Sequence, residues 1–247
     1  MGAPSLNLDL SHLDVVTALQ CGNRLRQATQ GAATLDDAAS AVAQCLFDSF
    51  VNPQTAAPAC ALVRVYVTRA FGSLTAEQKQ FARALIGEPN ALADDTKCLV
   101  LQGTAGLDAN WQRPSDSKGH QVIPLPSEEF VRNAPMIASL IEQFGLQIAD
   151  VVRPRLHAER ELVDKNYNVF HVEHAIGSPY IPAQSDFVVP YGIQSVVGFG
   201  GVLSTGDLYA AILFSRVHIP HESAKRFRSL ALTLRAALFM LRGKVEQ

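Results

Sequence analysis

The strongest pattern in the chain is a pair of apolar runs in residues 191–215, which flank the polar turn Ser204-Thr205-Gly206-Asp207. Two such runs joined by a short glycine-containing loop predict a β-hairpin. Side chains alternate between the two faces of a strand, and here both alternating sets are apolar. A sheet with one face in water would show a polar residue at every second position. We therefore expect the hairpin to be covered on both faces, and a ligand is one candidate cover.

Hydrophobic periodicity elsewhere predicts the remaining elements. Alternating or β-branched apolar runs predict strands over 60–68, 97–104, 120–125 and 168–175. Helical spacing predicts helices over 13–30, 35–50, 75–86, 127–144 and 220–245, with an interruption at Pro135 in the fourth, and a short solvated helix over 155–165. These elements do not alternate regularly. The expected fold class is therefore α+β, with a central antiparallel sheet of about six strands flanked by the N- and C-terminal helices.

The same order predicts a single domain. Residues 1–12 are expected to form a flexible tail and residues 13–242 the domain, with N-terminal helices in 13–50 and a C-terminal helix over 220–245. Apolar residues in that last helix recur at steps of three and four, as in a coiled-coil seam: Phe227, Leu230, Leu234 and Leu241. Packing on the chain's own sheet explains this stripe, and so does a homodimer interface, which the width of the stripe favours.

Composition narrows the classes of function. The 247-residue chain has a net charge of −2, which argues against a nucleic-acid-binding surface. Its apolar runs are far shorter than the ~20 residues of a membrane-spanning helix, and the N-terminus lacks the pattern of a signal peptide. The four cysteines form no C-x-x-C pair. This spacing argues against structural zinc and favours the reducing cytoplasm.

The hairpin also carries a family resemblance. An aliphatic-x-Ser-x-aliphatic strand, a glycine turn and a leucine-rich strand resemble the closing hairpin of GAF domains. Here the corresponding segments are Ile193-Gln194-Ser195-Val196-Val197-Gly198, Val202-Leu203, Gly206-Asp207-Leu208 and Ala211-Ile212-Leu213. The resemblance, which extends over residues 13–242, implies a GAF/PAS-like sensory module. Such a module binds a small molecule and passes a shift through its C-terminal helix to a histidine kinase or another signalling output domain.

Departures from the family pattern restrict the ligand. The cyclic-nucleotide signature of GAF domains is absent, since Lys165-Asn166 stand in reversed order and His174 follows Phe170 at the expected acidic place. No cysteine follows Cys98, whereas the cysteine that attaches a bilin would lie in the later half of the domain. Both a cyclic nucleotide and a covalent bilin are therefore disfavoured, and the cofactor stays unknown.

Aromatic side chains cluster in the segments that are expected to cover the sheet. Small-molecule pockets are mostly apolar with a few polar groups. The predicted ligand-binding residues are therefore the aromatic ones together with three polar ones on or beside the last strands: Trp111, Phe170, Tyr180, Phe187 and Tyr191, with His171, Gln194 and Ser195. Ordinary core packing explains the aromatic residues equally well.

Two other motifs resemble functional sites but predict neither a metal site nor a phosphate site. His171-Val172-Glu173-His174 is not the H-E-x-x-H motif of zinc proteases. On a strand, His171 and Glu173 would face one way and His174 the other, so we expect no metal site there. The glycines of Gly198-Phe199-Gly200-Gly201 lead into a turn and strand, with no helix N-terminus to hold a phosphate, and so predict a bulge or a close approach of backbones.

Three hypotheses follow from the sequence. The leading one is a non-catalytic cytoplasmic sensor that binds a small ligand or partner and acts as a homodimer. The second is a dimerisation or scaffold domain whose pocket is filled by side chains. The third is a small redox enzyme on the same fold, such as a free methionine sulfoxide reductase, which would require Cys60 and Cys98 to meet at the mouth of a pocket.

Overall fold

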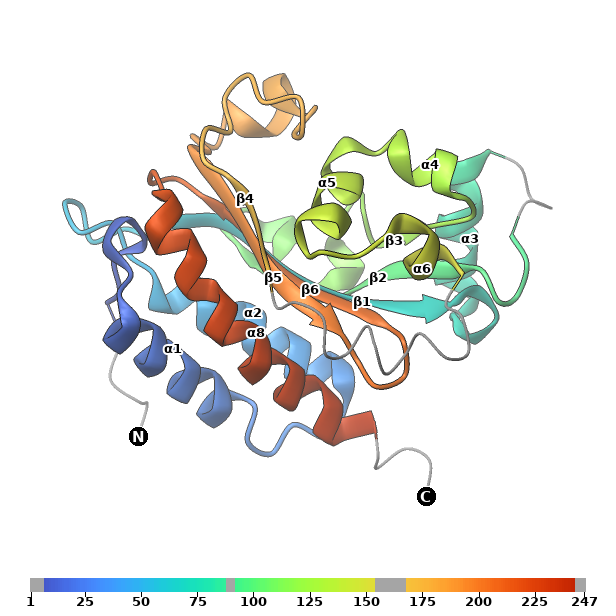
Figure 1. Ribbon diagram of the computed structural model, residues 1–247, viewed down its shortest axis with the longest axis horizontal. Coiled ribbons are helices and arrows are strands. Elements are labelled where there is room, and N and C mark those ends of the chain that lie inside the picture. The colour runs from blue at the N-terminus through green and yellow to red at the C-terminus, as the bar shows by residue number, and fades with distance from the viewer. Residues whose placement is uncertain (1–6, 88–91, 154–167, 243–247) are drawn as a thin grey trace.

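A six-stranded antiparallel sheet forms the centre of the molecule (Figure 1). The computed structural model describes residues 7–87, 92–153 and 168–242, with side chains as far as residue 238. The strand order is β3-β2-β1-β6-β5-β4. The strands are β1 Cys60–Ala70, β2 Lys97–Gly106, β3 Val122–Pro124, β4 Val169–Val172, β5 Ser195–Val202 and β6 Leu208–Ser215. The predicted α+β class is confirmed, and the helix expected over 155–165 lies outside the described residues.

Three helices cover one face of the sheet (Figure 1): α1 Val15–Ala28, α2 Leu35–Ser49 and α8 His221–Arg242. The first two begin at reciprocal capping boxes, which pair Asp14 with Thr17 and Thr34 with Asp37. Such caps satisfy backbone N–H groups that a helix start leaves without partners. Alternate residues of β1, β5 and β6 fill the core below this layer, among them Val63, Val65, Val197, Phe199 and Leu213.

The other face of the sheet is covered by short helices and by residues 175–193. The helices are α4 Glu128–Arg132, α5 Pro135–Gln143 and α6 Ile148–Val152. The covering segment contains one helical turn, Gln184–Val188. The remaining helix, α3 Ala76–Ile86, packs at the β2–β3 edge of the sheet. The hairpin is therefore covered on both faces, as its two-sided hydrophobicity predicted, and every residue of β5 and β6 is buried.

The α8 stripe packs inside the chain's own core. Phe227, Leu230 and Leu234 are at most 1% exposed, and the Phe227 ring contacts Phe50 and Phe199. The sheet and the N-terminal helices already cover these three residues, which leaves them no free surface for the predicted dimer seam. The side chain of Leu241 lies outside the described residues. Homodimer formation itself stays a prediction.

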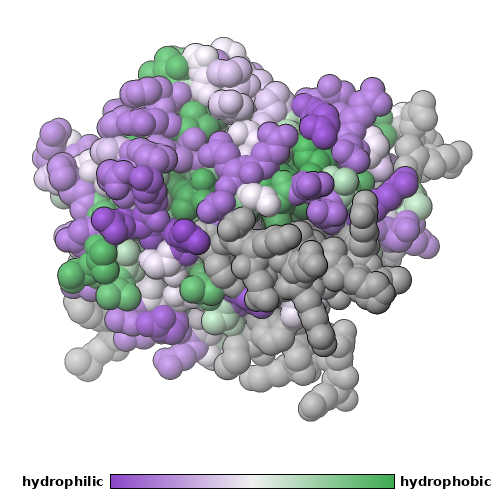
Figure 2. Space-filling view, viewed as in Figure 1, coloured by the Kyte–Doolittle hydropathy of each residue, from purple (hydrophilic) through white to green (hydrophobic). Residues whose placement is uncertain are grey.

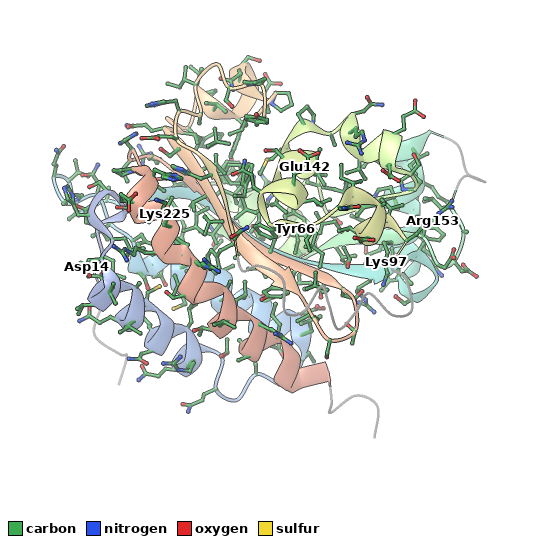
Figure 3. All side chains as sticks on the ribbon, viewed as in Figure 1. Asp14, Tyr66, Lys97, Glu142, Arg153 and Lys225 are labelled. Carbon is green, nitrogen blue, oxygen red and sulfur yellow. The ribbon has the colours of Figure 1, made fainter. Side chains whose placement is uncertain are left out.

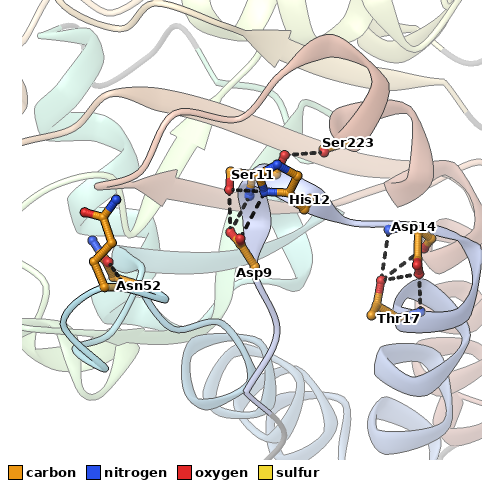
Figure 4. A network of polar contacts seen from close by, with 8 residues as sticks. Asp9, Ser11, His12, Asp14, Thr17, Asn52 and Ser223 are labelled. Atoms are coloured by element: carbon orange, nitrogen blue, oxygen red, sulfur yellow. Dashed lines mark hydrogen bonds and ion pairs between the residues drawn. The ribbon is translucent and has the colours of Figure 1, made fainter.

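The expected N-terminal tail is attached to the domain from Leu8 onward. Leu8 and Leu10 are buried, and Leu8 forms a parallel β-bridge with Phe50. Figure 4 shows the polar contacts that follow, in which the carbonyl oxygen of Ser11 accepts a hydrogen bond of 3.0 Å from Ser223 on α8. The predicted boundary at residue 12 is therefore too late, since these apolar side chains belong to the core.

The glycines of β5 allow two backbones to approach closely, as the sequence predicted. A Cβ atom on Gly200 would collide with the carbonyl oxygen of Tyr209 on the neighbouring strand. Gly103 is in the same situation against the backbone of α2 at Ala39. Glycine is required where no space exists for a side chain. These two positions fix how tightly β6 packs beside β5 and α2 over β2.

Candidate functional site

A cavity of about 640 Å³ lies on the sheet face opposite α8. Its floor is formed by side chains of the central strands, including Leu62, Tyr66, Ile212 and Phe214. Its walls come from residues 108–120, from α5 and from residues 181–191. In Figure 3 the labelled Tyr66 lies near the middle of the molecule, among the side chains above the sheet. The cavity is within the size range of small-molecule sites.

Three aromatic side chains form one wall of the cavity. The ring centroids of Trp111 and Tyr191 lie 4.5 Å apart, and those of Trp111 and Phe187 5.6 Å apart. Phe187 also meets Phe214 of β6 edge-on, with centroids 5.0 Å apart. Three of the predicted ligand-binding residues, Trp111, Phe187 and Tyr191, are thus brought together at the cavity from two distant segments. This wall favours an apolar or aromatic ligand.

Arg64 of β1 places a positive charge at the floor of this apolar cavity. It is 9% exposed, and it alone is buried among the described charged side chains that line the cavity. Its Nη2 donates to Ser117 Oγ at 2.9 Å and its Nη1 to Tyr66 Oη at 3.3 Å. Both acceptors are neutral, and Nε has no hydrogen-bond partner among the described residues. No carboxylate pairs with Arg64 within the part of the chain that the structure describes, although buried arginines are normally paired.

Hydrogen bonds hold the other polar groups around the cavity. The hydroxyl of Tyr191 donates to Asp108 at 2.9 Å. The Asn110 backbone and this hydroxyl lower the pKa of Asp108, and in return the Asp108 carboxylate raises the pKa of Tyr191. The hydroxyl of Tyr66 donates to the backbone oxygen of His120 at 3.1 Å. These bonds join the 108–120 loop to residues 181–191 on one side and to the strand floor on the other.

The remaining predicted ligand-binding residues lie elsewhere. Phe170 is fully buried in the core, and Tyr180 is 45% exposed. His171 faces α8, where its Nε2 donates to the backbone oxygen of Ile219 at 2.9 Å. Gln194 is exposed at two small surface depressions. The fully buried Ser195 bonds to backbone groups on the α8 side of the sheet. These five therefore do not line the cavity, and a ligand-binding role for any of the eight stays a prediction.

Sequence reasoning missed Arg64, which is the residue that most distinguishes this cavity. The signal was present, since Arg64 interrupts an otherwise apolar strand, CALVRVYVT. In a sheet covered on both faces, a charged residue in a central strand must be buried. Its missing counter-charge could be found only once the surrounding loops were placed.

Cys60 and Cys98 are not arranged as a redox pair. All four are buried free thiols. Cys98 pairs with Arg69 at one end of β1, whereas Cys60 begins that strand. Nine residues of strand separate these two positions, or about 30 Å. Burial raises the pKa of both thiols to about 12, which keeps them protonated and unreactive. The requirement that Cys60 and Cys98 meet at a pocket mouth is not fulfilled.

Comparisons with known proteins place the fold. No protein-family model matches the sequence, and a search of curated proteins finds no match. The structure of free methionine-R-sulfoxide reductase from Neisseria meningitidis, in complex with its substrate, has a TM-score of 0.50 at 11% identity, over 94% of this chain and 97% of that chain. A GAF domain structure has a TM-score of 0.46 at 13% identity, over 92% and 90%. The GAF domain of an Acinetobacter phosphoenolpyruvate-protein phosphotransferase has 0.43 at 12%, over 93% and 98%. Identities this low concern the fold alone. The fold of this chain is similar to that of the Neisseria structure, and GAF domain structures are among its structural neighbours.

Proposed function

We propose that this chain is a sensory domain that binds a small amphipathic anion, such as a carboxylic acid with an apolar body, in the cavity over β1 and β6. The observation that carries the proposal is the buried guanidinium of Arg64, which no carboxylate of the described residues neutralises, at the floor of a mostly apolar cavity. Burying a charge without a counter-charge costs several kcal/mol. A ligand carboxylate would supply the counter-charge, and guanidinium groups bind carboxylates through paired hydrogen bonds.

The aromatic wall accounts for the rest of the ligand. Trp111, Phe187 and Tyr191 would cover an apolar body, while the acidic group reaches Arg64. Asp108, Lys118 and Asp186 also line the cavity, but none of them is buried. Water screens charges that it reaches, so these three residues contribute less to the choice of ligand than Arg64 does.

The route from this cavity to α8 passes through one strand. Ile212 and Phe214 of β6 line the cavity, while Tyr209 and Leu213 of the same strand face the helical layer. The hydroxyl of Tyr209 donates to the backbone oxygen of Ala231 on α8 at 3.0 Å. A ligand that favours one position of β6 would thereby favour one position of α8. We expect α8 to pass this shift to a signalling output domain such as a histidine kinase.

Self-association, if it accompanies sensing, would use residues other than the predicted seam. Val15, Val16 and Leu19 of α1 and Leu232 of α8 are more than half exposed. Figure 2 shows hydrophobic residues gathered at the lower left, over α1. None of the helices in the described residues combines the length and hydrophobicity that a membrane span requires. We propose a homodimer in which α1 faces its counterpart, with a cytoplasmic location.

Native mass spectrometry of freshly purified protein tests the binding function. The matched variants are Arg64→Met and Arg69→Met, because Arg69 lies on the same strand but does not line the cavity. We expect the wild type and Arg69→Met to retain a small acid, and Arg64→Met to have lost it. If the ligand is lost on purification, thermal-shift measurements with a panel of apolar acids and their amides test binding instead. The proposal fails if no acid in the panel raises the melting temperature of the wild type.

The redox activity of the Neisseria enzyme is not carried over to this chain. A dithiol reaction needs two reactive cysteines that can reach one another. Cys60 and Cys98 lie at opposite ends of the β1–β2 pair, and burial keeps both thiols protonated. The scaffold alternative requires a filled pocket, whereas the cavity over β1 is open.

A further inference from the structure

Four of the seven histidines of the chain gather where β4 ends and α8 begins. The rings of His171 and His221 stack with centroids 5.9 Å apart, and those of His174 and His218 with centroids 5.4 Å apart. This cluster lies on the α8 side of the sheet and shares no residue with the cavity. It needs an explanation separate from ligand binding.

Three side chains of this region direct ligating atoms to a common point. Glu173, His174 and His218 each offer one atom, and these atoms all lie within 4.8 Å of one another. One of these separations, from His218 Nε2 to Glu173 Oε1, is 3.2 Å. Bonds of about 2.0–2.1 Å in a tetrahedral zinc site place neighbouring ligand atoms about 3.3 Å apart. Modest rotations of the three partly exposed side chains would bring the other two separations to that value.

The sequence-based objection to a metal does not hold, because β4 ends at Val172. The predicted strand continued to residue 175, and its alternation would have turned His174 away from Glu173. The chain instead bends at Glu173, so the alternation stops before these two residues. The third residue, His218, comes from the connection between β6 and α8, which no local motif could indicate.

A buried serine holds the two segments in place. The hydroxyl of Ser195 donates to the backbone oxygen of Glu173 at 2.6 Å and accepts from the backbone N–H of Ile219 at 2.9 Å. This fully buried side chain thus connects the backbone of Glu173 to that of Ile219, the neighbour of His218. The backbone N–H of Ala175 also donates to Gln194 at 2.8 Å. The ligating side chains therefore extend from fixed backbone positions, which reduces the ordering cost of metal binding.

We propose that Glu173, His174 and His218 bind one divalent transition-metal ion of the zinc type. Two imidazoles and one carboxylate form the ligand set of open zinc sites, in which a fourth position is left to water or another small molecule. Imidazole ligands favour zinc, copper or nickel over magnesium and calcium. A surface depression of about 340 Å³, lined by His174, Gln194 and His218, gives access to that position.

The position of this site gives the metal a structural consequence. His218 lies three residues before the start of α8, and Glu173 directly follows β4. A bound ion would therefore join the edge strand to the entry of α8. Because metal binds the folded arrangement only, it also raises the stability of the domain. The ion would restrict the movement of α8, the helix that we propose transmits the signal.

Metal titration of the full chain, freed of any affinity tag and of metal, tests this site. Zn²⁺ affinity is measured by calorimetry, and the ligand set by the visible absorption of bound Co²⁺. We expect one equivalent per chain and the absorption of a tetrahedral site. Affinity should fall at least about ten-fold in His218→Ala and in Glu173→Gln. His221→Ala is the matched control, since it removes a histidine of the same cluster outside the ligand set, and its affinity should equal that of the wild type.

The titration has outcomes that overturn the site. Absence of saturable Zn²⁺ binding in the wild type would leave Glu173 and His218 as an ion pair only. Unchanged affinity in both ligand variants would assign the ion to other residues, and an equal loss in His221→Ala would contradict the proposed set. Circular dichroism of each variant verifies the fold. None of these outcomes bears on the cavity, so failure here is separate from failure of the sensory proposal.

Discussion

Replacing Arg64 by methionine should remove ligand binding with little effect on the stability of the ligand-free domain. Methionine keeps an unbranched, apolar side chain in the space of the arginine stem. The two hydrogen bonds that Arg64 donates would be lost, and bonds that involve a charged group contribute about 1.5–3 kcal/mol each. Their acceptors stay satisfied, because Ser117 still donates to Gly119 and Tyr66 to His120.

The opposing term is the cost of the buried charge itself. An unpaired buried ion costs several kcal/mol, and the unpartnered Nε adds about 1–3 kcal/mol. The two contributions are of similar size and opposite sign. We therefore expect the free energy of unfolding of Arg64→Met to lie within about 1 kcal/mol of the wild type. An arginine whose charge is neutralised inside the chain would behave differently, since removing one partner of a buried ion pair costs about 3–5 kcal/mol.

Urea denaturation at pH 7, followed by far-ultraviolet circular dichroism, measures this difference. The ligand must first be removed, because a bound acid would stabilise the wild type alone. Arg69→Met is the control, because it replaces arginine by methionine on the same strand but outside the cavity. A loss of 3 kcal/mol or more in Arg64→Met, with an unchanged dependence on urea concentration, would show that Arg64 is structural and would refute the reasoning.

Three further predictions concern packing, thiols and assembly. Gly200→Ala should lower the free energy of unfolding by about 1–3 kcal/mol or more, because its Cβ atom collides with the Tyr209 backbone. Gly201→Ala should cost less, because its Cβ atom lies 3.3 Å or more from the Tyr209 side chain, and urea denaturation of both variants decides it. The four buried cysteines should react with a thiol reagent at neutral pH only after denaturation, and fast labelling of the native protein would contradict their burial. Leu19→Lys should convert the proposed homodimer into a monomer in light scattering, and an unaffected dimer would place the interface away from α1.

The fold was readable from the sequence wherever local signals agreed with tertiary packing. The helices α2 and α3 begin within one residue of their predicted starts, and the two-sided hydrophobicity of the hairpin correctly indicated two covering layers. The stripe on α8 was found, but its partner was not, because a buried stripe has the same spacing whether it packs on its own sheet or on a second chain. Phe227 shows which alternative holds.

The candidate site was less accessible to sequence reasoning. Trp111 and Tyr191 were expected in one pocket because both are aromatic and lie near covering segments, and the structure brings them together. His171 and Ser195 were predicted to line the same pocket, but both lie away from the cavity, toward α8. Strand alternation does not say which face of the sheet carries a ligand. Arg64 is of interest because no carboxylate of the described residues pairs with it. This depends on how distant segments pack around it, which the sequence does not show.

The most direct test of the central claim is a titration followed by the fluorescence of Trp111. This residue is the only tryptophan of the chain and lines the cavity, so its emission reports binding there. Octanoate and octanamide have the same apolar body and differ in charge. We predict that octanoate changes the emission of the wild type and of Arg69→Met in a saturable way, that octanamide binds at least about ten-fold more weakly, and that Arg64→Met no longer distinguishes the two. Equal binding of octanoate and octanamide by the wild type would contradict the claim that Arg64 selects an anion.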